Sequence, residues 1–297
     1  MEFTEQYDIV VVGAGVAGIA AALAAARDGF KTALVEKTII PGGLATSGLV
    51  FVYLPLCDGN GTQVTYGISE ELLKLSFRYG PGNVPTDWRE KRNAHERERY
   101  STCFSPASFV LALDETLQQA GVDIWFDTLV CATRCEDQRI KAIEVENKSG
   151  RGVINGYCFI DASGDADLAY HSGAQCAKGD NWLSIWALQT SLQSAQLAVE
   201  HHDGARLLNM FCLGGDNAGI GSPTDIPKMD GTDGKQVTKF VLEGRRLLRE
   251  FYQQQHDNGG MTSRENLFPL TLPNMAQFRT TRRIVGSTTL TDNQHGR

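Results

Sequence analysis

The feature that most constrains the fold is the segment "IVVVGAGVAGIAAALAAA" at residues 9–26, in which three glycines separate two apolar runs. The β-branched run before the glycines is typical of a strand buried on both faces, and the alanine-rich run after them is typical of a helix. A hydropathy window would flag these 18 mostly apolar residues as a membrane span. The glycines instead divide them into a strand, a turn and a helix, each too short to cross a bilayer.

The context of these glycines is that of a dinucleotide-binding unit. Residues 13–18 fit the pattern G-x-G-x-x-G, a predicted strand at residues 8–12 precedes them, and a predicted helix at about residues 16–28 begins within them. A second predicted strand at residues 32–35 runs into Glu36, which lies 18 residues after Gly18. An acidic residue at about this spacing of ~20 is typical of a dinucleotide-binding βαβ unit.

Each residue of this unit has an expected role. Gly13 permits the turn, Gly15 lets backbone N–H groups approach a pyrophosphate, and Gly18 lets the helix pack on the strand. Glu36 would accept hydrogen bonds from the adenosine ribose and would repel a 2′-phosphate, which disfavours NADP although Lys37 is adjacent. NAD and FAD remain as candidates, and a glycine turn without a ligand is the structural alternative.

Composition excludes several classes of function. The chain has 297 residues, 42% of them hydrophobic and 21% charged, with a formal net charge of -7, which disfavours a nucleic-acid partner. Its seven cysteines show no Cys-x-x-Cys pattern, so we expect buried free thiols in a reducing compartment and no metal site. The start "MEFTEQYD" lacks the basic region of a signal peptide, so we expect a cytoplasmic protein with no membrane partner.

Further elements follow from periodicity and end signals. Ser105 as N-cap, Pro106 and the later Gly121 bound one clear helix. Tight polar turns predict an antiparallel meander after it, and its last segment returns to a buried strand that ends near Asp161. Other predicted helices are at residues 69–79, at residues 89–99 (a solvated helix or a flap over a site) and at about residues 235–256; the meander strands are at residues 122–127, 129–135, 140–147 and 152–163. We place a loop at residues 214–234.

Three segments together resemble a known family. "GAGVAGIAAALAAARDGFKTALVEK", "PGGLATSG" and, after the meander, "DASGDADLAYHSGA" resemble the glutathione-reductase-type FAD fold. The resemblance is to the FAD-dependent oxidoreductases related to fumarate reductase and heterodisulfide reductase flavoproteins. It covers residues 1–175 more fully than residues 176–297. It implies an α/β Rossmann-like FAD/NAD(P)-binding domain with a central parallel sheet and an inserted antiparallel meander (residues 1–175), plus an incomplete α+β substrate or cap domain (residues 176–297).

The resemblance also implies FAD as the cofactor and a set of residues along it. The pyrophosphate is assigned to Gly13, Gly15, Val16, Ala17 and Gly18, and the ribose to Glu36 and Lys37. The approach to the flavin is assigned to Gly42, Gly43, Leu44, Ala45 and Thr46, and the adenine to Val130. The turn that closes over the cofactor is assigned to Ala162, Ser163, Gly164 and Asp165. For the pair Gly42–Gly43, an ordinary type II turn after Pro41 is the alternative.

The segment "QFRTTRRIVGSTTLT" also resembles the family. Guanidinium groups suit a carboxylate substrate or the electron-rich edge of a flavin, so Arg279, Arg282 and Arg283 are candidate substrate residues. Surface ion pairing is the alternative for each of them. No Ser-His-Asp, paired-carboxylate or metal-ligand arrangement stands out, so no catalytic acid or base is assigned.

One part of the family pattern has no counterpart. The resemblance implies a last strand, a Gly-Asp turn and a helix N-terminus at the flavin, but the nearest candidate, "LGGDNAGIGSP" at residues 213–223, reads as a loop without an apolar strand before it. We therefore interpret the chain as shortened at its C-terminus, either naturally or as a fragment, with weak FAD binding and turnover. A homo-oligomer, or a second chain that completes the flavin site, are the partner arrangements left open.

Three functional hypotheses result. The first is an FAD-dependent oxidoreductase, or the N-terminal part of one, that transfers a hydride with a small organic substrate. The second is a non-catalytic nucleotide-binding protein derived from the same fold. The third, an NAD-dependent dehydrogenase, needs a catalytic His or Tyr-Lys arrangement after the dinucleotide unit, which the sequence does not offer.

Overall fold

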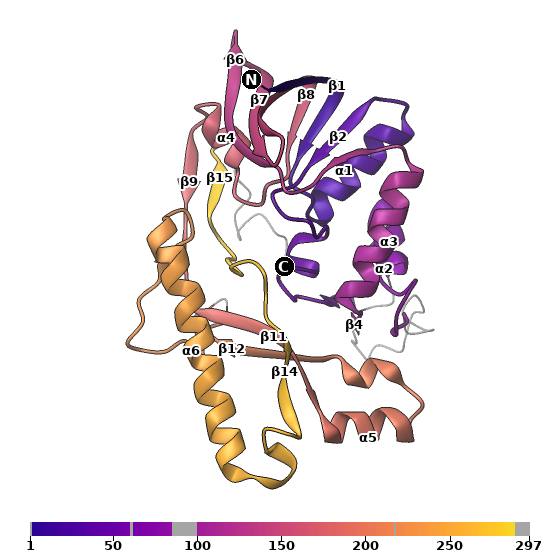
Figure 1. Ribbon diagram of the computed structural model, residues 1–297, viewed down its shortest axis with the longest axis vertical. Coiled ribbons are helices and arrows are strands. Elements are labelled where there is room, and N and C mark those ends of the chain that lie inside the picture. The colour runs from indigo at the N-terminus through magenta and orange to yellow at the C-terminus, as the bar shows by residue number, and fades with distance from the viewer. Residues whose placement is uncertain (1, 60–61, 85–99, 217, 289–297) are drawn as a thin grey trace.

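The computed structural model describes residues 2–59, 62–84, 100–216 and 218–288, so the predicted helix or flap at residues 89–99 lies outside the described residues. Figure 1 shows a large mixed sheet flanked by helices and, below it, a small antiparallel sheet beside one long helix. The helices are α1 (Val16–Arg27), α2 (Ile68–Leu75), α3 (Pro106–Gln119), α4 (Asp167–His171), α5 (Leu192–Glu200) and α6 (Gly234–Asn258).

Within the described residues, the strands form five sheets. The six-stranded sheet has the order β5 (Asp123–Trp125), β2 (Thr32–Val35), β1 (Phe3–Val12), β8 (Gly150–Asp161), β7 (Arg139–Asn147), β6 (Leu129–Glu136). The three-stranded sheet, called the second sheet below, has the order β12 (Asn209–Gly214), β11 (Ser184–Ser191), β14 (Leu267–Thr271). The two-stranded pairs are β3 (Val52–Tyr53) with β4 (Thr102–Cys103), β9 (Cys176–Lys178) with β15 (Arg282–Ile284), and β10 (Asp180–Asn181) with β13 (Met229–Asp230).

The parallel strands end at one edge of the large sheet. Val12 at the end of β1 is in register with Val35 of β2 on one side and with Asp161 of β8 on the other. Since ligands of open α/β sheets bind at the carboxyl ends of their strands, this edge is where a cofactor is expected. The observed architecture confirms the predicted α/β Rossmann-like class.

The two faces of this sheet are buried in separate clusters. On one face, α1 contributes Ile19 and Leu23, and α3 contributes Phe109 and Leu113, all fully buried. Figure 1 shows α1, α2 and α3 together on this side. The helix α3 begins as predicted, with Pro106 in its first turn and the Ser105 hydroxyl accepting a hydrogen bond from the Ser108 amide at 3.4 Å.

The predicted meander is wrong in one respect. The segment 122–127 was expected to be its first strand, but β5 pairs in parallel with β2, with Val35 opposite Trp125. The meander therefore contains β6, β7 and β8 alone, and β8 is long enough to pair antiparallel with β7 and parallel with β1. One continuous strand thus serves both as the end of the meander and as a central strand of the cofactor sheet.

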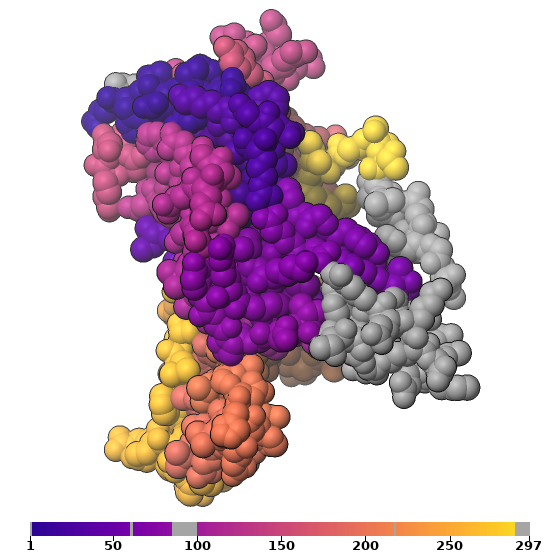
Figure 2. All heavy atoms as spheres, turned by 90° about the vertical axis from the view of Figure 1, so that its right-hand side faces the viewer, coloured from indigo at the N-terminus to yellow at the C-terminus, as the bar shows by residue number. Residues whose placement is uncertain are grey.

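The sequence patterns do not predict the second sheet. The strand β12 precedes the loop at residues 215–223, which corrects the expectation that no apolar strand stands there; it pairs antiparallel with β11. The helix α6, predicted at about residues 235–256, covers one face of this sheet through Leu248 and Tyr252. Figure 2 shows the orange residues of the second half of the chain below the purple residues of its first part. The domain boundary expected near residue 175 stays a prediction.

The cysteines are less buried than predicted. Cys57 is buried, but Cys135, Cys158 and Cys212 are exposed and the other three are intermediate. All seven are free thiols, and all lie in the described part of the chain. The six cysteines other than Cys57 lie in strands that are not fully buried, and the sequence pattern alone does not distinguish such strands from fully buried ones. Within the described residues, no helix is both long enough and apolar enough to span a membrane.

The helix α3 carries a carboxyl group without a partner, which leads to a prediction about stability. One oxygen of Asp114 is buried and has no hydrogen-bond partner among the described residues, and burial raises the pKa of this carboxyl group. We expect Asp114→Asn to increase the free energy of unfolding at pH 7 by up to about 1 kcal/mol, because it removes a charge that folding desolvates.

The gain should depend on pH. Since the pKa of Asp114 is raised in the fold, its carboxyl group is tolerated below the unfolded value of about 4 and destabilises as pH rises through the folded value. Urea denaturation at pH 7 and below pH 4 measures the difference, which should shrink at the lower pH. Glu115→Gln is the control, because Glu115 is paired with Arg78 at 2.9 Å and should lose stability or stay unchanged. A loss of stability in Asp114→Asn at pH 7 would contradict the prediction.

Candidate cofactor site

The turn between β1 and α1 is built from backbone groups in direct contact. A Cβ placed on Gly18 would overlap the carbonyl oxygen of Gly13, and a Cβ placed on Gly13 would overlap the backbone of Ala162. Ala162 is held there by its N–H, which donates to the carbonyl of Val12 at 2.8 Å. The strand β1, the helix α1 and the segment after β8 can therefore meet only where side chains are absent.

Gly15 differs from its two neighbours in the motif. No heavy atom of the described residues lies within 4 Å of the position that a Cβ would take on it. It is the N-cap of α1, and no described side chain caps the first amides of this helix. Val16 and Ala17, which follow, are exposed. Free amides at a helix N-terminus next to open space fit a pyrophosphate, since both the N–H groups and the helix dipole favour an anion.

Glu36 is held by the backbone around it. Its Oε2 accepts a hydrogen bond from the Ala14 amide at 2.8 Å, and its Oε1 accepts two from Thr38, from the amide and from the hydroxyl, both at 2.9 Å. A carboxylate has about four acceptor positions, so three are occupied and about one remains for a ribose hydroxyl. The carboxylate thus fixes the glycine turn as well as offering an acceptor at the sheet edge.

The residues after Glu36 form a loop that packs on the glycine turn. This GG loop, residues 41–48, reaches the turn through Gly42, whose amide donates to the carbonyl of Ala14 at 2.7 Å. A Cβ on Gly43 would lie 3.0 Å from the Cα of Gly15. Gly42 has φ 104° and ψ -15°, the left-handed geometry of a type II turn. The type II turn, which is the structural alternative for this pair, is therefore observed, and the assignment of Gly42 and Gly43 to the approach to the flavin stays a prediction.

The next residues of the GG loop divide into exposed and internal ones. Leu44 is exposed, and Gly43–Ala45 forms one short 3₁₀ turn. Thr46 is buried, and its hydroxyl donates to the carbonyl of Pro41 at 2.6 Å, so this hydroxyl closes the loop on itself. The assignment of Thr46 to a channel toward the flavin stays a prediction, as do those of Leu44 and Ala45.

A cavity at the sheet edge gathers residues from four separate segments. Five of the predicted cofactor residues line it: Gly13, Glu36, Lys37, Val130 and Ser163. Thr128 and Leu129 were not predicted, because they reach the cavity through the pairing of β5 with β2: the amide of Thr128 donates to the carbonyl of Glu36 at 3.0 Å. Asp167, at the start of α4, was not predicted either. The lining residues are Val12, Gly13, Val35, Glu36, Lys37, Thr128, Leu129, Val130, Ser163 and Asp167.

The turn after β8 closes this edge. Asp161 accepts hydrogen bonds from the Ser163 amide at 3.1 Å and from the Ala169 amide at 2.9 Å, which ties the turn to α4. Gly164 is exposed at its tip. Asp165, predicted as a cofactor residue, accepts a hydrogen bond from the Thr281 hydroxyl at 2.6 Å and so faces the C-terminal segment.

The three predicted substrate arginines lie in different environments. Arg282 is largely buried, its guanidinium is paired with Asp167 and donates to the carbonyl of Asp165 at 3.0 Å, and it lies 4.3 Å from the Tyr170 ring centroid. These contacts favour the ion-pairing alternative for Arg282, which attaches β15 to α4. Arg279 and Arg283 are exposed. No cluster of three or more metal-ligating side chains occurs among the residues that the structure describes.

Together these features define a class of protein. A parallel sheet with a glycine turn, an uncapped helix N-terminus and an acceptor carboxylate at the next strand end is a dinucleotide-binding flavoprotein-type domain. The chain belongs to the family of FAD dependent oxidoreductases, whose sequence model matches residues 8–211. This membership confirms the predicted family and FAD as the cofactor.

Individual proteins are similar to part or most of this chain. The chain is 39% identical over 159 residues to a thioredoxin reductase of Ureaplasma parvum, covering 52% of this chain and 43% of the relative. A p-nitrophenol 4-monooxygenase from Pseudomonas putida is 15% identical with a TM-score of 0.51, over 95% of this chain and 68% of that one, and shows the shared fold. A geranylgeranyl bacteriochlorophyll reductase-like protein from Thermoplasma acidophilum is 21% identical with a TM-score of 0.44, over 63% and 47%. The chain thus spans less than half the length of two of these proteins.

The contrast between Gly15 and Gly18 gives a prediction about FAD binding. We expect Gly15→Ala to fold with a loss of about 1 kcal/mol or less, because its Cβ enters open space, and to bind FAD at least about tenfold more weakly. Gly18→Ala should instead lower the melting temperature of the apoprotein, because its Cβ has no room. Thermal melts without FAD and fluorescence titrations with FAD measure the two effects.

The control for this pair is Gly234→Ala, at the start of α6, where a Cβ also meets open space. It should change neither the melting temperature nor FAD affinity appreciably. Gly15→Ala with wild-type FAD affinity would contradict the placement of the pyrophosphate at this turn.

The hydrogen bonds of Glu36 lead to a separate prediction. In Glu36→Gln one acceptor oxygen becomes an NH₂ group that faces a backbone N–H, either that of Ala14 or that of Thr38. We expect the free energy of unfolding of the apoprotein to fall by about 1–3 kcal/mol, because a donor then loses its partner. Lys37→Gln, which changes an exposed neighbour, serves as the control in the same urea denaturation. Unchanged stability in Glu36→Gln would show that the carboxylate is not needed to fix the turn.

Proposed function

We propose that the chain uses FAD to exchange a hydride with a small organic substrate, and that the second sheet carries the substrate-binding residues. The observation that carries this proposal is the direct attachment of the second sheet to the GG loop by Gln277. The bound flavin supplies the two-electron chemistry, and the residues of the chain bind and orient the reactants.

Gln277 joins the two parts through its side-chain amide. Its Oε1 accepts a hydrogen bond from the Trp186 amide in β11 at 2.8 Å, while its Nε2 donates to the carbonyl of Gly48 in the GG loop. The side chain is buried, with 6% of its surface exposed. The neighbouring Asn274 amide donates to the carbonyl of Ser47 at 2.8 Å. Buried amide hydrogen bonds of this kind fix the second sheet against the loop that approaches the flavin.

The two faces of β11 have different partners. Ile185 and Ala187 face α6, whereas Leu188 packs into the core cluster of the first part with Phe51 and Phe104. Trp186, two residues before Leu188, lies on the same face because side chains alternate along a strand. This face therefore turns toward the cofactor domain, which supports a role for it in binding substrate.

Arg279 is the arginine best placed for a substrate carboxylate. Desolvation raises the pKa of the Cys212 thiol, and the positive charge of Arg279 partly offsets this rise. Cys212 is directly opposite Trp186 in the sheet register, which puts it on the face turned toward the cofactor domain. Arg282 is engaged by Asp167, so we assign the substrate role to Arg279 ahead of Arg282 and Arg283.

The names of the relatives indicate two kinds of substrate. The monooxygenase is named for p-nitrophenol, a small organic molecule, and its fold resembles 95% of this chain. The thioredoxin reductase is named for a protein substrate. The seven cysteines of this chain contain no Cys-x-x-Cys pair, and all are free thiols. A small organic substrate is therefore the better match.

Anaerobic reduction of the FAD-loaded protein tests the proposal. We expect a subset of small organic donors, presented as a panel of hydroxy acids, amino acids and phenols together with NADH, to bleach the flavin absorbance by two electrons per flavin. Deuterium at the reacting C–H bond should slow this bleaching, because that bond breaks in the hydride step. Arg279→Met should raise the KM of a carboxylate donor more than it lowers kcat, with Arg283→Met as the control.

Two results would overturn the proposal. Bleaching without an isotope effect under single-turnover conditions would argue against hydride transfer. Stable binding of FAD or ADP without flavin reduction by any donor would instead support the non-catalytic nucleotide-binding hypothesis.

A further inference from the structure

A groove on the second part of the chain has the features of a separate ligand site. It lies between α6 and the end of β14, has a volume of about 470 Å³, and shares no residue with the cofactor cavity. Pockets for small molecules typically have volumes of roughly 300–1,000 Å³ and mostly apolar linings with a few placed polar groups. The apolar walls here are formed by Leu248, Tyr252, Pro269 and Leu272.

Two arginines line this groove without a partner. Arg245 and Arg249 are four residues apart on α6, and within the described residues neither takes part in an ion pair or a side-chain hydrogen bond. No carboxylate is among the described residues that line the groove. Residues at i and i+4 of a helix lie on the same face, so both guanidinium groups border one end of the apolar surface.

Among the described residues, the neighbouring Arg246 on α6 has partners that Arg245 and Arg249 lack. Arg246 is held by Glu243 and Glu250, each at 2.7 Å, in a pattern typical of a solvated helix face. The chain has a formal net charge of -7, so two unpaired cations beside an apolar surface depart from its general character. Guanidinium groups bind carboxylates through paired N–H donors, so such an arrangement would recognise a carboxylate joined to an apolar group.

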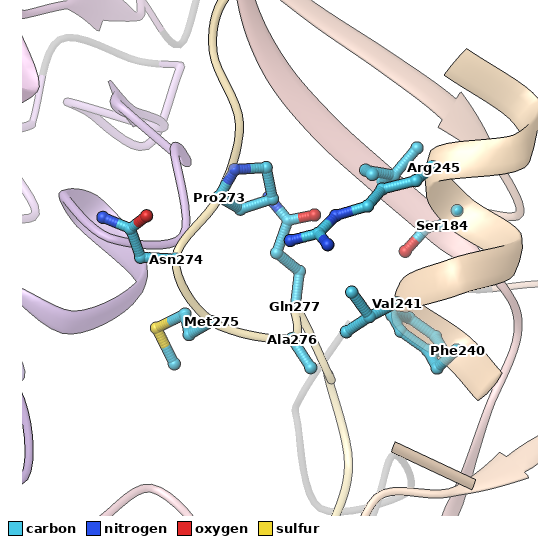
Figure 3. Close-up of a pocket in the computed structure, with 11 residues that line it drawn as sticks. Ser184, Phe240, Val241, Arg245, Pro273, Asn274, Met275, Ala276 and Gln277 are labelled. Atoms are coloured by element: carbon cyan, nitrogen blue, oxygen red, sulfur yellow. The ribbon is translucent and has the colours of Figure 1, made fainter. Parts of the chain in front are cut away.

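Figure 3 shows how Arg245 lies. Its side chain extends from α6 toward Pro273 and Gln277, across a cavity that adjoins the groove. This cavity is lined by α6, by the start of β11 and by residues 273–277. Arg245 thus borders both the cavity and the groove. A ligand with its acid group at Arg245 and Arg249 would place its apolar body against Leu248 and Leu272.

From this arrangement we infer that the groove between α6 and β14 binds an organic acid with an apolar body, with Arg245 and Arg249 at its carboxylate. The inference is independent of the proposed hydride transfer, because none of these residues belongs to the cofactor site. Arg245, Arg249 and Leu272 are new assignments, which the sequence patterns alone do not separate from a solvated helix face.

Calorimetric titration of the FAD-loaded protein with octanoate tests the inference, with octanol and acetate as probes that lack the charge or the apolar body. We expect octanoate to bind at least about tenfold more tightly than either. Arg245→Met combined with Arg249→Met should lower octanoate affinity at least about tenfold, and Arg246→Met should leave it unchanged. Leu272→Asp should also weaken binding, since it places a like charge at the apolar wall.

Three outcomes would overturn the inference. One is no binding of octanoate, and another is equal binding by the double variant and the wild type. The third is a dimer in sedimentation experiments that the double variant abolishes while octanoate does not bind, which would assign the groove to a second copy of the chain. Circular dichroism of each variant checks that the loss of affinity is not a loss of folding.

Discussion

The close approach of three backbone segments at the glycine turn is the constraint on which the rest of the structure depends. The carbonyl of Gly13 occupies the place where a side chain of Gly18 would be, and the backbone of Ala162 occupies the place where a side chain of Gly13 would be. This contact fixes the start of α1 relative to β1 and β8. It also determines where Glu36 and the GG loop can pack, because both bond to Ala14 between these glycines.

Local chemistry explains why the first part of the chain could be predicted. The glycine turn, the strand ending at Val35 and the helix capped by Ser105 each depend on residues within a short window, and all three lie where the sequence predicts them. The parallel partner of β5 could not be predicted, because Asp123–Trp125 is three residues long and its apolar pattern fits either orientation. Thr128 was missed at the cofactor cavity for the same reason, since the pairing of β5 with β2 brings it there.

The second part of the chain shows the opposite case. Its strands contain Gln, Ser, Asn and Gly, so their patterns are weak, and their order in the sheet joins segments from residues 184–191, 209–214 and 267–271. The role of Arg282 illustrates the limit at a single residue. The sequence shows a conspicuous pair of arginines, but only the position of Asp167 on α4 distinguishes a structural cation from one that is available to a ligand. Gln277 had no signal in the sequence at all, although it joins the two parts.

The pairing of β1 with β8 has a consequence for how the molecule forms. During synthesis β1 can pair with β2 early, but its long parallel neighbour β8 is available only after residue 150 has been made. Contacts between distant positions close slowly, because a long loop must be ordered before the contact repays its entropy. The glycine turn therefore lacks its contact with the backbone of Ala162 until β8 has been made. We expect the cofactor to bind after β8 has docked, rather than to nucleate folding of the domain.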